Sequence, residues 1–246
     1  MKHLPNIKDY YEIMNKIPLK ASYTREELMI PELLVEAEKE IELYYCTHNE
    51  YMNPRAKVFI IGITPGFTQM SKSISTARAC IEENKPLEEM VHLCKKEGRL
   101  AGVLRKNVGE MLEALDLPNG LGVESAKVLF DEREDLLHTT SMIPFAAFVK
   151  GKNYTGHSPQ LLKSDFLMSY VEAHFYPQIE VMQEALIIPL GRCVEEVIKG
   201  LIAKGKVDED KCLLGFPHPS GANVNRKKQF EEEKQQLLIK VKQFCK

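Results

Sequence analysis

The chain has 246 residues, of which 44% are hydrophobic and 28% are charged, as expected of a globular protein that buries one large core. Its formal net charge of −2 argues against a protein that coats nucleic acid through bulk charge, so any DNA contact must be a local basic patch. No apolar run approaches the roughly 18 residues of a membrane span, and the N-terminus lacks a signal-peptide core. We therefore expect a soluble cytoplasmic protein.

The cysteine pattern gives no sign of a metal centre. The six cysteines are scattered, with no Cys-x-x-Cys pair and no short Cys/His spacing, so neither a zinc site nor an iron–sulfur cluster is expected. We expect reduced thiols, most of them in the core, and neither metal nor cofactor.

The predicted elements begin with a helix. Thr24, followed three residues later by Glu27, forms a capping-box pattern that predicts a helix running toward about Tyr45. A short apolar run then predicts the first strand over 57–63. A long crossover follows, for which helices are predicted around 69–83, 86–97 and 101–116.

Three more strands are predicted, over 136–143, 185–190 and 211–215. A helix near 165–184 precedes the third strand of the chain, and a final helix is predicted from about 225 to 244. Alternation of strands and helices is typical of a parallel sheet. We expect an α/β fold with a central four-stranded parallel sheet flanked by helices on both faces, in a single domain (1–246) with an N-terminal helical extension over about 1–54.

Unusual polar loops follow each predicted strand, and the carboxyl ends of parallel strands share the edge of the sheet where ligands bind. After the four strands, in order, come Gly62-Ile63-Thr64-Pro65-Gly66, the segment from Pro144 to Gly156, Gly191-Arg192, and Gly215-Phe216-Pro217-His218-Pro219-Ser220-Gly221-Ala222-Asn223. This ordered set predicts a ligand site at that edge.

The first and last of these loops resemble the two signatures of the uracil-DNA glycosylase superfamily. That family carries G-x-[D/N/A]-P-[Y/G] after its first strand and H-P-S after its last, and the resemblance spans roughly residues 55–230. It implies the glycosylase fold and a monofunctional DNA glycosylase. Such an enzyme hydrolyses the N-glycosidic bond of a flipped-out uracil or C5-modified pyrimidine and leaves an abasic site, without a cofactor.

The resemblance assigns His218 and Thr64 to catalysis. The departing base accumulates negative charge, so a hydrogen-bond donor such as His218, held between two prolines, would stabilise the transition state more than the ground state. Thr64 stands where the family has an Asp or Asn that orients the attacking water, although one branch has alanine there. A hydroxyl can position water but cannot act as a base at neutral pH.

The base pocket is predicted around the first loop. Where the strictly uracil-specific branch has a tyrosine that excludes C5 substituents, this chain has Gly66, which predicts room for a C5 group, as in modified phage DNA. Phe67 either stacks on the flipped base or packs into the core. The remaining pocket candidates are Gly62, Ile63, Pro65 and, for reading the base edge, Thr140, Ser141 and Asn153.

DNA contacts are predicted from the last loop and from nearby basic residues. Ser220 and the backbone N–H groups of Gly221 and Ala222 are candidate phosphate ligands. Ala222 occupies the position of the family's leucine wedge but is too small for that role, which leaves Asn223 or another loop. The further DNA-binding candidates are Lys152, Arg192 and Arg226.

Other classes of function are weaker or remain open. The chain lacks the Gly-Lys-[Ser/Thr] and G-x-G-x-x-G patterns, so a nucleotide cofactor is not expected. No lysine nucleophile is evident, so strand cleavage through a Schiff base is not expected either. A non-catalytic nucleic-acid-binding module of the same fold and a hydrolase of free nucleosides or nucleotides remain alternatives.

Overall fold

The computed structural model describes residues 2–246, which fall into two compact units. Unit 1 contains the chain up to Met52 together with Thr64–Ala101 and Ser141–Phe175. Unit 2 contains Asn53–Ile63, Gly102–Thr140 and Tyr176–Lys246. No helix within the described residues is both long and apolar enough to cross a membrane.

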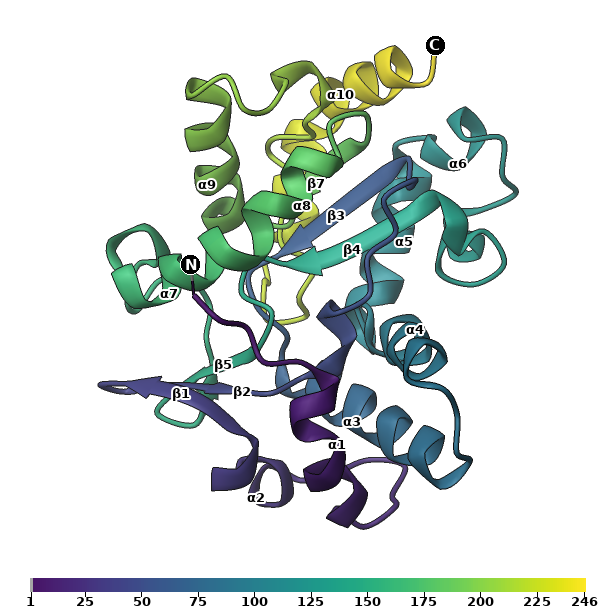
Figure 1. Ribbon diagram of the computed structural model, residues 1–246. Helices are drawn as coiled ribbons and strands as arrows, with labels where there is room; N and C mark the ends of the chain where they lie inside the picture. Colours follow the sequence, from purple (N-terminus) through teal and green to yellow (C-terminus); the bar gives the residue numbers. More distant parts are fainter. Residues whose placement is uncertain (1) are drawn as a thin grey trace. The chain divides into compact units, whose positions relative to one another are not determined.

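Unit 2 is built on a small sheet in the order β4-β3-β7 (Figure 1). Its strands are β3 (Val58–Gly62), β4 (Leu137–Ser141) and β7 (Leu186–Pro189). β3 pairs in parallel with β7, from Val58 opposite Leu186 to Ile61 opposite Pro189. Residues 58–61 are all buried although successive side chains point to opposite faces, so both faces of β3 are covered. The strands predicted at 57–63, 136–143 and 185–190 are confirmed.

The predicted fourth strand over 211–215 is wrong. In its place, Cys212 forms a single parallel bridge with Ile187, and the Leu213 N–H donates to the Ile187 carbonyl at 2.9 Å. A 3₁₀ turn over Glu209–Lys211 comes directly before this bridge, and Gly215 leaves the extended region with φ +87°. Too few extended residues remain for a strand, so the parallel sheet has three strands.

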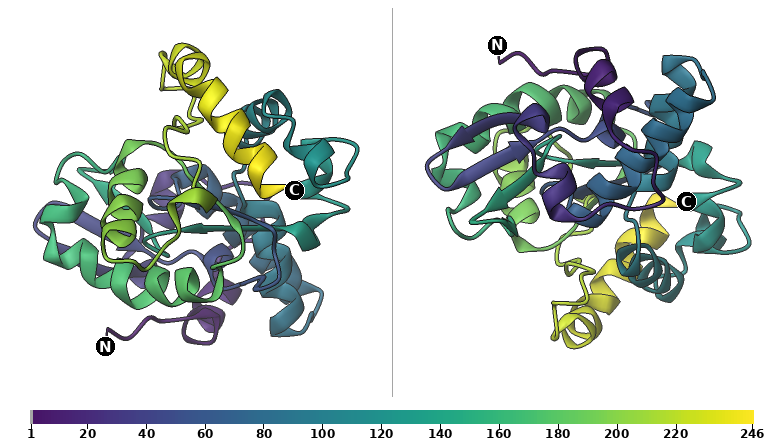
Figure 2. Two further views of the ribbon diagram at one scale, coloured as in Figure 1. Left: turned by 90° about the horizontal axis from the view of Figure 1, so that it is seen from above. Right: turned by 90° about the horizontal axis from the view of Figure 1, so that it is seen from below.

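Helices complete unit 2. They are α5 (Val103–Ala114), α6 (Leu117–Gly120), α8 (Tyr176–Val181), α9 (Arg192–Ala203) and α10 (Arg226–Phe244). The end of α10 lies against α6, where a side chain at Gly120 would collide with Cys245 (Figure 2). The helices predicted near 101–116 and 225–244 are confirmed, whereas α9 was not predicted.

Unit 1 contains an antiparallel sheet that the sequence analysis did not predict, in the order β1-β2-β5-β6. Its strands are β1 (Leu34–Glu38), β2 (Ile41–Tyr44), β5 (Ala146–Val149) and β6 (Lys152–Asn153). Its helices are α1 (Ile7–Lys16), α2 (Arg25–Leu28), α3 (Phe67–Glu82), α4 (Leu87–Gly98) and α7 (Asp165–Tyr170). The helices predicted near 69–83 and 86–97 are confirmed. The one predicted near 165–184 is present as α7, a π-helical turn over Val171–Phe175, and α8.

The helix predicted from Thr24 toward Tyr45 is wrong beyond its first turn, so the N-terminal extension is only partly helical. The capping box forms, with the Thr24 N–H donating to Glu27 Oε2 at 2.9 Å, but α2 ends at Leu28. Pro31 comes three residues later, at the start of a separate 3₁₀ turn, and proline cannot continue a hydrogen-bonded helix. Residues 34–44 instead form the β1–β2 hairpin, which turns through Lys39 at φ +56°.

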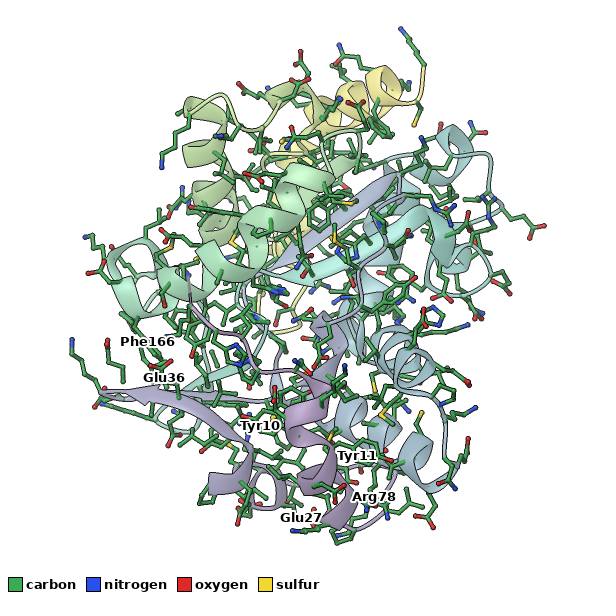
Figure 3. The ribbon with its side chains drawn as sticks, in the orientation of Figure 1. Tyr10, Tyr11, Glu27, Glu36, Arg78 and Phe166 are labelled. Atoms are coloured by element: carbon green, nitrogen blue, oxygen red, sulfur yellow. The ribbon has the colours of Figure 1, made fainter. Side chains whose placement is uncertain are left out.

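Helix α1 and the residue that follows it contact other parts of unit 1 (Figure 3). Tyr10 stacks on Tyr45 with ring centroids 3.9 Å apart, and the Ile7 N–H donates to Glu50 Oε2 at 3.0 Å. Beyond the helix, Arg78 Nε donates to the Ile17 carbonyl at 2.8 Å. The half-buried carboxylate of Glu50 therefore accepts from the first turn of α1, where the helix dipole favours negative charge.

Candidate functional site

Thr64 is the second residue after β3 in the chain, and its side chain is hydrogen-bonded within unit 1. Its Oγ1 donates to the Phe145 carbonyl at 2.7 Å and accepts from the Ala147 N–H at 2.9 Å. A hydroxyl has one hydrogen and two acceptor lone pairs. With these two bonds in place, Thr64 has one lone pair left, with which it can accept a hydrogen bond from a water molecule.

Gly66 is closely approached by the side chains of Asn153 and Gln69. Its backbone angles (φ −82°, ψ +169°) are open to any residue, so its lack of a side chain matters for room and not for conformation. A Cβ there would lie 3.3 Å from Asn153 Nδ2 and 3.9 Å from Gln69 Oε1. The side chain of Gln69 also accepts the Gly66 N–H at 3.0 Å, which holds the loop at the start of α3.

Asn153 adjoins this loop, and it is exposed, whereas the other two candidates for reading the base are buried. Its Oδ1 accepts from the Phe67 N–H at 3.2 Å and from Arg25 Nη2 at 3.2 Å. Thr140 and Ser141 are buried within β4. Asn153 is therefore the candidate among the three whose polar atoms reach the surface next to Gly66.

Arg25 is a further residue of this surface that the sequence analysis missed. Its guanidinium carbon lies 4.8 Å from the centre of the Phe67 ring and 5.1 Å from that of Phe148. Nη1 of Arg25 donates to the Gly151 carbonyl at 3.1 Å. The half-buried Phe67 ring therefore packs against Arg25. Nothing in the sequence connects Arg25 with a hairpin more than a hundred residues away, so only the fold reveals it.

His218, in unit 2, is held in a defined protonation state. The Ser220 N–H donates to His218 Nδ1 at 3.2 Å, so Nδ1 is an acceptor and the neutral ring carries its hydrogen on Nε2. Burial lowers the pKa of His218 below its ordinary value. The residue is thus a neutral N–H donor at Nε2.

Two residues fix the position of the His218 loop. Gly191, which follows β7, has φ +84° and ψ +168°, and a Cβ there would lie 2.8 Å from the His218 Cβ. Asn107 on α5 donates from Nδ2 to the Pro219 carbonyl at 2.6 Å. The Leu190 N–H beside Gly191 donates to the Ile61 carbonyl of β3 at 2.9 Å. The His218 loop therefore lies at the carboxyl edge of the unit 2 sheet, where β3 ends.

The tip of this loop is organised by its own polar groups. Ser220 Oγ accepts from the Ala222 N–H at 3.1 Å, Asn223 Nδ2 donates to the His218 carbonyl at 3.1 Å, and Arg226 Nη1 donates to the Ser220 carbonyl at 2.9 Å. Gly221 and Ala222 are exposed. Val224 has 88% of its surface exposed, more than any other large exposed hydrophobic residue described. The sequence analysis did not single out Val224, which directly follows the predicted loop.

The remaining predicted site residues differ in accessibility. Ile63 and Pro65 are buried and pack beneath their loops, and Gly62 is half-buried. Lys152 on β6 and Arg192 at the start of α9 are exposed, in unit 1 and unit 2 respectively. Both side chains are accessible to a polyanion. Five of the six cysteines are buried, as expected, and within residues 2–246 no His, Cys, Asp and Glu side chains gather in a group of three that could hold a metal ion.

Lys95 on α4 is a buried amine that the sequence analysis did not single out. It is 2% exposed, and its Nζ donates to Asn49 Oδ1 at 3.5 Å. Asn49 in turn donates from Nδ2 to the Pro144 carbonyl at 3.0 Å, in the loop after β4. Burial, reinforced by the positive charge of Arg99, lowers the pKa of Lys95 well below its ordinary value. The amine is enclosed, so it is not an exposed nucleophile.

Comparisons with known proteins agree with the two signature loops. Residues 50–242, which include Thr64 and His218, match the family model described as "Uracil DNA glycosylase superfamily". The chain is 38% identical over 240 residues to the Bacillus subtilis (strain 168) protein named "Uncharacterized protein YoxB", with 97% of this chain and 93% of that protein covered. No solved structure matches the chain significantly. The chain belongs to the uracil DNA glycosylase superfamily.

Proposed function

We propose that this protein is a monofunctional DNA glycosylase that hydrolyses the N-glycosidic bond of a flipped-out uracil or C5-modified pyrimidine and leaves an abasic site. The observation that carries the proposal is the state of His218. Its Nδ1 accepts from the Ser220 N–H, and this leaves a neutral N–H donor at Nε2 within the H-P-S loop of a superfamily member.

His218 would act on the leaving base. As the bond from C1′ to the base nitrogen breaks, its electron pair moves onto the base, and a base oxygen gains negative charge. A preorganised donor aimed at that oxygen stabilises the transition state more than the ground state. Since Nδ1 already accepts a hydrogen bond, this charge is stabilised by a neutral imidazole and does not require an imidazolium.

Thr64 would position the water that attacks C1′. Its hydroxyl hydrogen is directed to the Phe145 carbonyl, so the contribution left to it is to accept one hydrogen bond from the water. A water that donates one hydrogen to Thr64 presents a lone pair elsewhere. No proton is removed by Thr64, so the reaction depends on the leaving base being well stabilised.

Glu50 in unit 1 has a pKa that would suit a general base, but its bonds argue against that role. Burial raises the pKa of Glu50 to about 7, which is the range a base needs. Both oxygens of Glu50 are occupied, however, by the Tyr45 hydroxyl and by the Ile7 N–H at the start of α1. We therefore assign Glu50 to the stability of α1 and not to catalysis.

The residues proposed to contact DNA are exposed. Exposed Lys152 and Arg192 are available to phosphates, as is the backbone N–H of exposed Gly221. The Ala222 N–H, also predicted as a phosphate ligand, is bonded to Ser220 Oγ. Exposed Val224 supplies the apolar wedge that Ala222 cannot, because a side chain inserted between bases offsets the cost of unstacking. A cytoplasmic location stays a prediction.

The rival function is a non-catalytic DNA-binding module, and the bonded state of the Thr64 hydroxyl favours it. The discriminating experiment measures base release from end-labelled oligonucleotides, single- and double-stranded, that contain uracil, a thymine mispair, 5-hydroxymethyluracil, 5-hydroxymethylcytosine or glucosylated cytosine. Free nucleosides of the same bases are run in parallel. Alkali-sensitive abasic sites should form in at least one oligonucleotide. Binding of DNA without release from any of them would establish the module instead, and release from nucleosides alone would indicate a nucleoside hydrolase.

A further inference from the structure

The orientation of the Asn153 amide can be assigned from its partners. Its oxygen accepts two N–H groups, one from the Phe67 backbone and one from Arg25, both at 3.2 Å. Since an amide oxygen only accepts and an amide nitrogen only donates, two donors on one side fix which end is oxygen. The Nδ2 end therefore points the other way.

The Nδ2 end faces the space that Gly66 leaves open. It would lie 3.3 Å from a Cβ at Gly66, the nearest heavy atom to that position. Asn153 is exposed, and no acceptor within residues 2–246 bonds to its Nδ2. The Nδ2 group of an exposed asparagine, with its two N–H donors, therefore lies next to the position that a side chain at Gly66 would occupy.

Arg25 holds this arrangement and adds positive charge to it. Its guanidinium packs over the rings of Phe67 and Phe148 and donates to the Gly151 carbonyl as well as to Asn153. Bonding from a cation polarises the Asn153 amide and makes its N–H groups stronger donors. The surface beside Gly66 is therefore suited to a group that accepts hydrogen bonds, and not to a methyl group.

We propose that Asn153, positioned by Arg25, recognises the C5 substituent of the target pyrimidine, and that this substituent carries an oxygen acceptor, as hydroxymethyl does. The inference rests on the proposed function, because only for a bound pyrimidine does Gly66 mark the C5 side. Asn153 is then a specificity-determining residue, and Arg25 is a positioning residue that acts through it.

The expected discrimination is moderate. Exposed N–H groups bond to water when the substrate offers no acceptor, so a methyl group does not leave them unsatisfied. The gain from one such hydrogen bond corresponds to a preference of about three- to tenfold. A fully enclosed polar site would reject the methyl analogue far more strongly, by about 10⁴-fold or more.

The test compares substrates that differ by one oxygen atom. Single-turnover base release is measured for two matched pairs of oligonucleotides, thymine against 5-hydroxymethyluracil and 5-methylcytosine against 5-hydroxymethylcytosine. Equilibrium binding of the same oligonucleotides is measured by fluorescence anisotropy. The proteins are wild type, Asn153→Asp, Arg25→Met and Thr155→Val, the last an exposed control in the same segment.

Asn153→Asp is the sharpest variant because it keeps the shape and the oxygen that accepts from Phe67 and Arg25, replaces the N–H donors with an acceptor, and adds a negative charge that acts on both members of a pair alike. Wild type should prefer the hydroxymethyl member of at least one pair about three- to tenfold. Asn153→Asp should abolish or invert that ratio, Arg25→Met should reduce it, and Thr155→Val should keep it. A wild type without preference, or an Asn153→Asp protein with the wild-type ratio, would overturn the inference.

Failure of the proposed function gives a different result. If wild type releases none of these bases and none in the wider panel, the glycosylase proposal fails, and the ratio of dissociation constants then decides the inference. A binding preference that Asn153→Asp removes supports recognition of the hydroxymethyl group without catalysis. Equal binding of both members of each pair rejects it.

Discussion

At the scale of single residues, the position of His218 depends on Gly191, which has no direct role in the proposed chemistry. Gly191 has a combination of φ +84° and ψ +168° that is almost restricted to glycine. Its Cα also packs so closely on His218 that a Cβ would lie 2.8 Å from the histidine Cβ. Backbone freedom and space are therefore both required at this position.

We predict that Gly191→Ala lowers base release by about 10²-fold, because a displacement of a catalytic group by about 1 Å has an effect of this size. The free energy of unfolding should fall by about 1–3 kcal/mol from the strained backbone. Single-turnover rates and chemical denaturation measure the two effects.

Substitutions at two other glycines distinguish the effect of backbone strain on stability from the effect of displacing His218 on activity. Gly205 also has a positive φ, +66°, but a Cβ there meets nothing within 4 Å, so Gly205→Ala should lose stability and keep activity. Gly200 lies inside α9 with open space around it, so Gly200→Ala should gain about 0.5–1 kcal/mol. Equal activities of Gly191→Ala and Gly205→Ala would show that Gly191 does not position His218.

At the scale of elements, the loop before α10 presents Val224 to solvent on a framework fixed by its own hydrogen bonds. If Val224 is the wedge, Val224→Ala should slow base release from duplex DNA by about tenfold or more, since flipping a paired base costs a few kcal/mol. Release from single-stranded DNA, in which the target is already unstacked, should change little. The measured quantity is the ratio of the duplex rate to the single-strand rate.

A matched valine serves as the control for this loop. Val181 ends α8 in the same unit and is 55% exposed, so Val181→Ala removes the same atoms from another exposed position. Its rate ratio should equal that of wild type. A Val224→Ala protein with the wild-type ratio would place the wedge elsewhere.

We predict that the free energy of unfolding depends on pH through Glu50, which accepts a hydrogen bond from the first turn of α1. Burial raises the pKa of Glu50 to about 7, above the value of about 4.3 for an unfolded chain. The folded state therefore binds the Glu50 proton more tightly, and the contribution of Glu50 to stability falls as pH rises from about 4 to above 7. Glu50→Gln removes this dependence and should exceed wild type in stability by about 1–3 kcal/mol at pH 8.

Thermal unfolding at pH 5, 6.5 and 8 tests this prediction. The Tm difference between Glu50→Gln and wild type should be small at pH 5 and should grow toward pH 8. Glu12→Gln, an exposed position on α1, should follow wild type throughout. A Tm difference that does not change with pH would show that Glu50 is not linked to folding in this range.

At the scale of the whole molecule, the sequence predicts those parts of the fold whose signals are local. Apolar runs identify β3 and β7, because burial imposes this pattern directly. The segments of β4 (Leu-His-Thr-Thr-Ser), α3, α4, α5 and α10 are also predicted from their local sequence. The β1–β2 hairpin was missed because the Thr24 capping box marks where a helix begins and carries no information on its length. The prediction of a fourth strand was wrong because the extended segment around Cys212 is short. A 3₁₀ turn precedes Cys212, and Gly215 ends the extended segment with a positive φ.

In the candidate site, too, the sequence predicts the features with a local signal and misses those that depend on distant contacts. His218, Thr64 and Gly66 are predictable because they belong to short contiguous motifs. Arg25 and the bonded state of the Thr64 hydroxyl are not, since each depends on a contact with a segment about a hundred residues away in the chain. Residues that position others are defined by the fold and not by their neighbours in sequence.

The most direct test of the account is the rate of base release by His218→Ala on the oligonucleotide that wild type cleaves best, with His3→Ala as the exposed-histidine control. Removal of one preorganised donor should lower the single-turnover rate by about 10²–10³-fold, while the dissociation constant for DNA changes little. His3→Ala should match wild type. A His218→Ala protein that releases the base at the wild-type rate would contradict the assignment of His218 to the leaving base.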